Sequence, residues 1–280
     1  MMPNPETSRR TFLAGSLGIG LAACAPASIS PVPGARPYTG RLGVQLYTVR
    51  GLFEADFAGT LSALARIGYA DCETAGYFDH DPREVRAVLD EVGMTSRAAH
   101  IRLHELRDGF DQQLMYAKIM GQKSLYLGWI PEEERTADKY RALADLLNER
   151  GEEAKAAGFQ LGYHNHDFEF FDLGGTSGYD ILLDRADPSL VTMEIDFYWA
   201  AQAGVDPRVL FERAPGRFTS CHIKDRMADG SMVSVGDGEI DFGGLLAEAG
   251  KAGLETFYVE HDNPADPLQS VAKSYAYLTT

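Results

Sequence analysis

The stretch Leu161-Gly162-Tyr163-His164-Asn165-His166-Asp167-Phe168-Glu169 begins as an apolar strand and runs into a polar loop. Successive side chains of a strand point to opposite faces, so His164 and His166 are expected on one face and Asn165 on the other. Two imidazoles on one face at a strand end can hold a metal ion when neighbouring strands supply further ligands. The residues that the other strands carry at the same end therefore bear on both the fold and the site.

Strand-like and helix-like segments alternate regularly on both sides of this stretch. The expected strands, apolar as buried parallel strands are, cover residues 42–47, 69–74, 95–101, 124–129, 160–166, 191–197, 218–223 and 257–260. The expected helices cover residues 53–67, 81–92, 110–120, 137–157, 179–185, 207–214, 242–252 and 267–278. Eight strand–helix pairs predict an α/β fold of the (β/α)8 TIM barrel type. An open doubly wound sheet fits less well, because no glycine-rich dinucleotide-binding turn follows the first strand.

Length and composition are those of a globular chain with one large core. The chain has 280 residues, of which 45% are hydrophobic and 24% are charged, and its net charge is −15. This negative charge opposes binding to a nucleic acid backbone, which requires clustered Lys and Arg. The composition therefore predicts a small-molecule partner and no nucleic-acid partner, and it leaves the oligomeric state open.

The first 25 residues are expected to be an export signal rather than part of the fold. Ser8-Arg9-Arg10-Thr11-Phe12-Leu13 is typical of a twin-arginine signal, and an apolar run too short to span a bilayer follows it. An ordinary secretory signal is the alternative. The predicted organisation is a signal over residues 1–25, a tether rich in Pro, Ser and Ala over 26–40, and the barrel over 41–280.

The end of this signal, Leu21-Ala22-Ala23-Cys24, resembles a bacterial lipobox. On this interpretation Cys24 would carry the lipid and become the new N-terminus. Cleavage after Ala25 or Ala27 would instead release a soluble protein. The sequence favours an exported, periplasmic protein whose contact with a membrane is a lipid anchor at Cys24.

From the fifth strand onward, the expected strands end in ionisable side chains. The sixth contains Glu194-Ile195-Asp196, and the seventh ends in His222-Ile223-Lys224-Asp225. The eighth ends at Glu260, with Asp262 on the same face. Active residues of a TIM barrel lie at these C-terminal strand ends. Because buried charges without partners cost several kcal/mol, the pattern favours a metal site over purely structural polar residues.

These segments resemble the xylose isomerase-like TIM barrel superfamily and, within it, the sugar phosphate isomerase/epimerase branch. The resemblance rests on Gly43-Val44-Gln45-Leu46-Tyr47, Tyr163-His164-Asn165-His166-Asp167, Glu194-Ile195-Asp196, Cys221-His222-Ile223-Lys224-Asp225, Val235-Gly236-Asp237-Gly238-Glu239-Ile240-Asp241-Phe242 and Tyr258-Val259-Glu260. It spans nearly all of the chain from Leu42 onward. The order of these short motifs on successive strands is a stronger signal than any single motif.

The resemblance implies one divalent metal ion held by ligands from strands five to eight. Asp196, His222 and Glu260 match the last three ligands of the family pattern. At the first position, where many members carry glutamate, this chain has His164. The implied ligand set is therefore two histidines and two carboxylates, which suits Mn, Fe, Co or Zn more than Mg.

The same replacement affects the implied chemistry. Family epimerases commonly use two glutamates beside the metal, one removing a proton and the other returning it from the opposite face, and here only Glu260 remains of that pair. His100, at the end of the third strand, is the first candidate for a second base, with a structural histidine as an equal alternative. Lys224 is expected to hold a substrate oxygen. Further candidate bases are Glu169, Glu194 and His166.

Other polar and aromatic side chains near the strand ends are candidate substrate contacts. They are Gln45, Tyr47, Glu73, His166, Trp129 and Trp199. Aromatic faces can stack on a sugar ring, and polar groups can bind its hydroxyls. For each of these residues, ordinary packing in the core or at the rim is an equal alternative.

Three functions are consistent with the sequence. The first is an exported, metal-dependent isomerase or epimerase that enolises a sugar or sugar derivative. The second keeps the metal and the enolisation but expels a group, as a lyase or hydrolase acting on 3-keto-glycosides. The third is an exported sugar-binding protein without catalytic activity.

Overall fold

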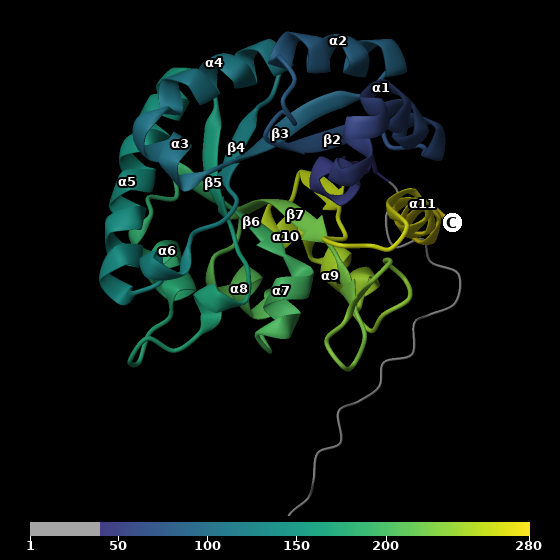
Figure 1. Cartoon of the computed structure of the whole chain (residues 1–280). Helices are drawn as coiled ribbons and strands as arrows, with labels where there is room; N and C mark the ends of the chain where they lie inside the picture. Colours follow the sequence, from purple (N-terminus) through teal and green to yellow (C-terminus); the bar gives the residue numbers. More distant parts are fainter. Residues whose placement is uncertain (1–39) are drawn as a thin grey trace, which may run out of the picture. The chain divides into compact units, whose positions relative to one another are not determined.

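The computed structural model describes residues 40–280, which form a closed barrel of parallel strands surrounded by helices (Figure 1). The strands succeed one another around the barrel in the order β1–β10–β7–β6–β5–β4–β3–β2. Their bounds are β1 (Gly43–Gln45), β2 (Asp71–Ala75), β3 (Thr95–Ile101), β4 (Ser124–Leu127), β5 (Gln160–His164), β6 (Val191–Asp196), β7 (Phe218–Ile223) and β10 (Thr256–Val259). The predicted (β/α)8 TIM barrel is confirmed. The predicted signal and the tether up to residue 39 lie outside the described residues.

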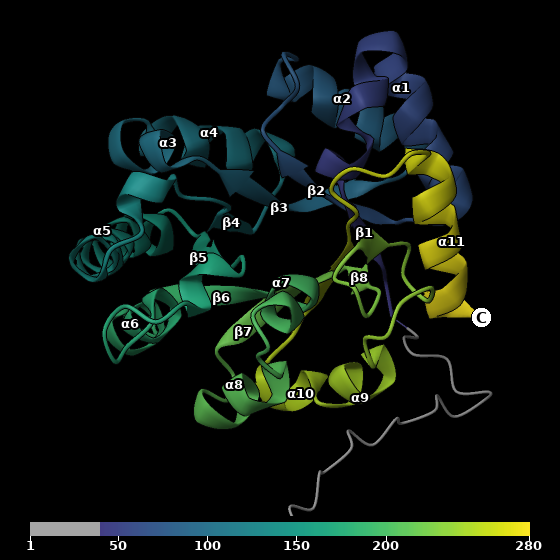
Figure 2. The same ribbon diagram turned by 60° about the horizontal axis from the view of Figure 1, so that its bottom comes forward.

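Helices connect successive strands on the outside of the barrel (Figure 2). Their bounds are α1 (Arg50–Ile67), α2 (Pro82–Val92), α3 (Leu103–Asp108), α4 (Phe110–Met120), α5 (Ala137–Ala156), α6 (Gly178–Arg185), α7 (Phe197–Gln202), α8 (Pro207–Arg213), α9 (Phe242–Ala247), α10 (Ala249–Ala252) and α11 (Pro267–Thr279). The first and last of these helices, α1 and α11, lie side by side where the barrel closes. Among the described residues, no helix is both long and apolar enough to cross a membrane.

Local sequence signals explain where the helices begin and end. At the start of α2, the Asp81 side chain accepts a hydrogen bond from the backbone N–H of Arg83, and Pro82 occupies the first turn. At its end, Gly93 adopts a φ of 75°, a left-handed conformation that glycine reaches without steric cost. This helix therefore matches the predicted segment 81–92 closely.

Two tyrosine rings fill the lower part of the barrel, below the C-terminal strand ends. Tyr126 of β4 and Tyr258 of β10 are both buried there with Ala98. A Cβ atom on Gly43 would lie 2.4 Å from the Tyr258 ring, and one on Gly162 would lie 2.5 Å from the Tyr126 ring. The two glycines in β1 and β5 are thus the positions where the strands make room for these rings.

Several strands end earlier than the sequence predicted, so residues expected in strands lie in the loops after them. β5 stops at His164, which places His166 in the loop, and β10 stops at Val259, one residue before Glu260. β1 ends at Gln45 because the Gln45 side chain accepts the N–H of Tyr47 and starts a 3-10 segment, η1 (Leu46–Val49). A hairpin that the sequence did not predict, β8 (Asp225–Arg226) with β9 (Met232–Val233), comes after β7.

Candidate active site

Ionisable side chains fill the upper part of the barrel in two layers. We define the inner layer as Glu73, His100 and Glu194, and the outer layer as Asp196, Lys224 and Glu260. Residues two apart in a strand share a face, so β6 places Glu194 inward at one level and Asp196 inward one level nearer the barrel mouth. The rings of His164 and His222 lie between the layers and contact both.

In the outer layer, three carboxylates surround the Lys224 ammonium, which is only 2% exposed. Its Nζ lies 3.1 Å from Asp196 Oδ2 and 2.8 Å from Glu260 Oε2. A third contact of 2.8 Å reaches Asp262 Oδ1. Burial alone would lower the pKa of Lys224, but these carboxylates outweigh it and raise the pKa well above its usual value. The lysine is therefore a fixed, buried cation.

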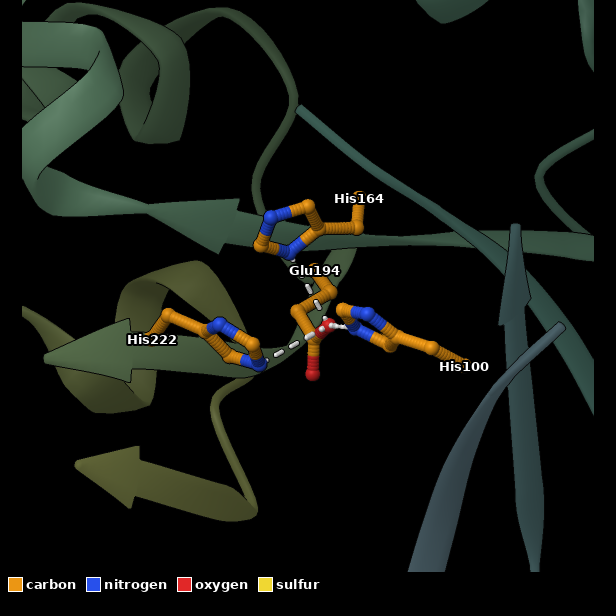
Figure 3. A group of neighbouring side chains, drawn as sticks. All are labelled: His100, His164, Glu194 and His222. Carbon is orange, nitrogen blue, oxygen red and sulfur yellow. Dashed lines mark hydrogen bonds and ion pairs between the residues drawn. The ribbon is translucent and has the colours of Figure 1, made fainter. Parts of the chain in front are cut away.

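In the inner layer, hydrogen bonds join imidazole nitrogens to two buried glutamates. Glu194 Oε2 lies 2.7 Å from His100 Nε2, 3.1 Å from His164 Nδ1 and 3.3 Å from His222 Nε2. Figure 3 shows this carboxylate between the three rings. Glu73 Oε2 lies 2.6 Å from His222 Nε2 and 3.1 Å from His100 Nε2. The two glutamates thus share two of the three imidazoles.

Above Glu194, Asp196, His222 and Glu260 offer ligand atoms within 4.8 Å of one another, and His164 approaches this group through Asp196. Asp196 Oδ2 lies 3.7 Å from His164 Nε2 and 3.9 Å from His222 Nδ1, and the latter lies 2.7 Å from Glu260 Oε2. Asp196 Oδ2 is buried and accepts no hydrogen bond within the described part of the chain. Such a set of imidazole nitrogens and carboxylate oxygens matches the ligands that a divalent transition metal takes. The donor chemistry at this point therefore fits a metal ion.

Known proteins resemble this chain over most of its length. The model of the xylose isomerase-like TIM barrel family matches residues 61–280. The chain belongs to this family. Inosose dehydratase of Geobacillus kaustophilus is 27% identical over 229 residues, covering 67% of this chain and 74% of that protein.

Solved structures of the family superpose on the barrel. A sugar phosphate isomerase/epimerase from Parabacteroides distasonis is 26% identical with a TM-score of 0.74, over 86% of this chain and 94% of that one. At lower identity, the fold matches the E. coli 3-keto-D-glucoside 4-epimerase YcjR (15%, TM-score 0.66, 86% and 99% covered). It also matches the IOLI protein with bound zinc (16%, TM-score 0.64, 85% and 96% covered).

In this member of the xylose isomerase-like family, the structure brings three of the four predicted metal ligands into one cluster. Three of the four, Asp196, His222 and Glu260, offer ligand atoms within 4.8 Å of one another. His164 reaches this group through Asp196 and belongs to a second cluster with His100, Glu194 and His222. Burial holds the pKa of His164 well below its usual value, so its ring is neutral, as a ligand must be.

The predicted substrate contacts divide into two groups. His166 and Trp199 lie together, with ring centroids 5.2 Å apart, and the buried His166 Nδ1 and Trp199 Nε1 have no hydrogen-bond partner among the described residues. Tyr47 is 39% exposed, with the Arg50 guanidinium 3.6 Å above its ring. Gln45 is fully buried and donates to Glu73 Oε2 at 2.7 Å. His166 and Trp199 thus keep polar atoms without a partner in the described part of the chain and Tyr47 is partly exposed, whereas Gln45 supports the inner layer.

The structure argues against two of the candidate bases. His100 is held between Glu73 and Glu194; burial lowers its pKa, but the two carboxylates outweigh this effect and raise the pKa to about 9. A ring that is protonated at neutral pH is not poised to remove a proton. Glu169 accepts hydrogen bonds from the Tyr163 hydroxyl at 2.6 Å and the His166 N–H at 2.7 Å. It stabilises the loop after β5.

The sequence did not predict two contacts that hold the inner layer together. Ser220 donates to Glu194 Oε1 at 2.6 Å, and Glu73 reaches His222, 149 residues away in sequence. The period-two alternation carries the signal for the first, since Ser220 stands two residues before His222 in β7. No sequence signal indicates the second, because strands β2 and β7 meet only across the barrel interior.

Proposed function

We propose that this chain is a metal-dependent enzyme that enolises a polyhydroxylated ketone, a keto-sugar or keto-cyclitol, and then eliminates a substituent from the β carbon. The observation that carries the proposal is the buried Asp196 Oδ2, which has no hydrogen-bond partner among the described residues and faces His164 Nε2 and His222 Nδ1. A carboxylate oxygen beside two imidazole nitrogens offers the mixed donors that a divalent cation takes, and the Lys224 ammonium, 3.1 Å from this oxygen, offsets its charge in the metal-free protein.

The residues that would hold the cation are His164, Asp196, His222 and Glu260. Their mixture of nitrogen and oxygen donors favours Zn, Mn, Fe or Co over Mg. A structural relative, the IOLI protein, has been crystallised with zinc, which supports the proposal. When bound, such an ion would polarise the substrate carbonyl and lower the pKa of the neighbouring C–H.

Two residues of the outer layer would act on the substrate, one by accepting a proton and one by donating a hydrogen bond. Burial raises the pKa of Glu260, but Lys224 and His222 outweigh it and hold the pKa well below its usual value, so Glu260 is an ionised carboxylate that can accept the α proton. Lys224 presents an ammonium group that can donate a hydrogen bond to the departing oxygen. His166 Nδ1 and Trp199 Nε1, both without partners in the described part, can bind substrate hydroxyls.

The donor set favours elimination over epimerisation. Epimerisation by two bases needs a second carboxylate on the opposite face of the substrate, and at that position the chain has His164. Elimination can use one carboxylate: Glu260 would take the α proton and pass it to the departing oxygen, while Lys224 keeps its own proton and donates a hydrogen bond to that oxygen. The relatives named inosose dehydratase support this assignment, since a dehydratase eliminates water.

A sugar epimerase is the second candidate, and the names of two structural relatives favour it. Both candidates begin with removal of the same proton. They differ in whether the proton returns to carbon or a β substituent departs.

An experiment in heavy water separates the two candidates. The purified full chain, loaded with Zn²⁺ or Mn²⁺, is incubated with an inosose or a 3-keto-glycoside, and the products are followed by NMR and mass spectrometry. We expect loss of water or of the aglycone. Deuterium entry with inversion and without elimination would instead identify an epimerase. Neither deuterium entry nor product with any of the metals would refute the proposal, and Glu260→Gln should abolish both signals.

A further inference from the structure

We propose that Glu194 is the positioning residue of the metal site: it fixes His164 so that Nε2, and not Nδ1, faces the cation. The inference rests on the proposed function, since it concerns the metal proposed there. It gives a role to Glu194, the deeper of the two carboxylates in β6, which is not one of the four proposed metal ligands.

Both oxygens of Glu194 are already engaged by other side chains. Its side chain is fully buried, and Ser220 donates to Oε1 at 2.6 Å. On Oε2 three imidazole nitrogens converge, from His100, His164 and His222, at 2.7, 3.1 and 3.3 Å (Figure 3). By contrast, Asp196 Oδ2, one level above, accepts no hydrogen bond within residues 40–280. The buried carboxylate oxygen of β6 that lacks a hydrogen bond thus lies above Glu194, and we place the cation there.

The hydrogen bond between Glu194 and His164 determines the state of that ring. A carboxylate oxygen accepts and does not donate, so His164 Nδ1 must carry the proton. A neutral imidazole has one N–H, which leaves the lone pair of Nε2 free. That lone pair lies on the side of Asp196 Oδ2, 3.7 Å away.

The other histidine ligand also has a glutamate behind it. Glu73 Oε2 accepts from His222 Nε2 at 2.6 Å, and on the other side of the ring Nδ1 lies 2.7 Å from Glu260 Oε2, so a metal ion bound at Nδ1 would replace the proton that this nitrogen shares with Glu260. His100 contacts Glu73 and Glu194 at 3.1 and 2.7 Å and joins the two carboxylates into one network. A carboxylate behind a metal-bound imidazole orients the ring and raises its basicity.

This arrangement explains how a histidine can stand where relatives commonly carry a glutamate ligand. Replacing Glu by His removes one negative charge from the ligand shell. Glu194 returns that charge directly behind His164, at 3.1 Å from its Nδ1. The His164–Glu194 pair together carries the charge that a single glutamate ligand would carry.

Metal affinity of Glu194→Gln tests the proposal without relying on turnover. We expect the Kd for Zn²⁺ and Co²⁺, measured on the purified full chain by competition with a chelator, to rise about 10- to 100-fold, as loss of such partners does elsewhere. The visible spectrum of the Co²⁺ form should shift, because the imidazole donor weakens. Glu194→Asp, which keeps the charge, should recover part of the affinity.

The matched control is Glu169→Gln. Glu169 is also fully buried and also accepts two hydrogen bonds, but from Tyr163 and the backbone of His166 rather than from imidazole nitrogens. This variant should keep the wild-type Kd. Equal losses in both variants would show a general effect of removing a buried charge and would refute the positioning role.

Nitrogen-15 NMR of the histidines reads the ring state directly. We expect a proton on His164 Nδ1 in the wild type and a mixture of tautomers in Glu194→Gln. An unchanged tautomer together with unchanged Kd would overturn the inference. So would metal binding that survives Asp196→Asn but vanishes in Glu194→Gln, since this would place the ion in the inner layer. Because the tautomer is measured also without metal or substrate, failure of the proposed function remains a separate result.

Discussion

Lys224 shows how one residue can depend on the groups around it. Its ammonium is 2% exposed and lies within 3.1 Å of Asp196, Glu260 and Asp262. Burying a charge costs several kcal/mol unless an opposite charge compensates it. The carboxylates compensate the buried ammonium, and the ammonium in turn compensates the buried carboxylates. Lys224 is therefore both a candidate hydrogen-bond donor to substrate and the counter-charge that allows two predicted metal ligands to remain ionised.

Lys224→Met should destabilise the metal-free protein. Asp196 and Glu260 would lose their shared cation, and breaking a buried ion pair typically costs about 3–5 kcal/mol in free energy of unfolding. Added Zn²⁺ should restore part of that loss and raise the Tm of the variant more than that of the wild type, because the ion takes over the counter-charge. Urea and thermal unfolding with and without Zn²⁺ measure both effects.

Lys251→Met is the control for this substitution, since Lys251 pairs with Glu212 on the surface. It should change the stability little, with or without the metal. If Lys224→Met were as stable as the wild type without metal, the two carboxylates would not depend on Lys224 for compensation.

At the scale of elements, the two charged residues that follow β7 serve different parts of the structure. Lys224 points into the barrel, and the next residue, Asp225, points toward the loop between β8 and α9. Asp225 is 1% exposed and accepts hydrogen bonds from the backbone N–H groups of Arg226, Gly236, Gly238 and Ile240 at 2.8–3.2 Å. One carboxylate therefore folds a loop of irregular backbone against the strand that carries His222.

Asp225→Asn should loosen this loop. The amide would present N–H groups to backbone N–H donors, leaving some of them without an acceptor at about 1–3 kcal/mol for each unsatisfied group. We expect faster amide hydrogen exchange over residues 227–241 and new protease cleavage there, while the barrel strands stay protected. Asp229→Asn, at the exposed tip of the same loop, should leave the exchange rates near those of the wild type. Equal exchange in both variants would contradict the role given to Asp225.

At the scale of the whole molecule, Asp71 helps to close the barrel at the end opposite the site. Its oxygens accept hydrogen bonds from Thr95 of β3 at 2.7 Å and from the Tyr258 hydroxyl of β10 at 3.3 Å. These contacts join β2 to β3 and, across β1, to β10. Burial raises the pKa of Asp71 to about 6, while Thr95 and nearby arginines lower it in part.

Asp71 should make the stability of the fold depend on pH. The pKa of Asp71 is higher in the folded than in the unfolded protein, so the folded protein binds the proton more tightly. This difference contributes fully to the free energy of unfolding below about pH 4, and the contribution is lost as the pH rises to about 6. Asp71→Asn cannot ionise, so it should be more stable than the wild type above pH 6, by about 1–3 kcal/mol, and equally stable near pH 4. Urea unfolding across this range measures the difference. The surface variant Asp145→Asn should show no such gain at high pH, and a gain for Asp71→Asn that did not depend on pH would contradict the assignment.

The sequence by itself determined the barrel, the strands that carry the site and most of the residues that meet there. Alternating apolar and amphipathic segments predicted the order of strands and helices, and the resemblance to the family pointed to Asp196, His222 and Glu260, which the barrel brings together. The predicted export signal over residues 1–25 and the lipid anchor at Cys24 stay predictions, as they lie outside the described residues.

Only the tertiary structure decided which atoms meet. Strand periodicity places a side chain on a face but not at a depth relative to strands across the barrel, because that depth is set by strand tilt and stagger. The contact of Glu73 with His222, the convergence of three imidazoles on Glu194 and the confinement of His100 between two glutamates all depend on it. For this reason His100 could be proposed as a base from the sequence, whereas the folded barrel makes it a partner of buried carboxylates.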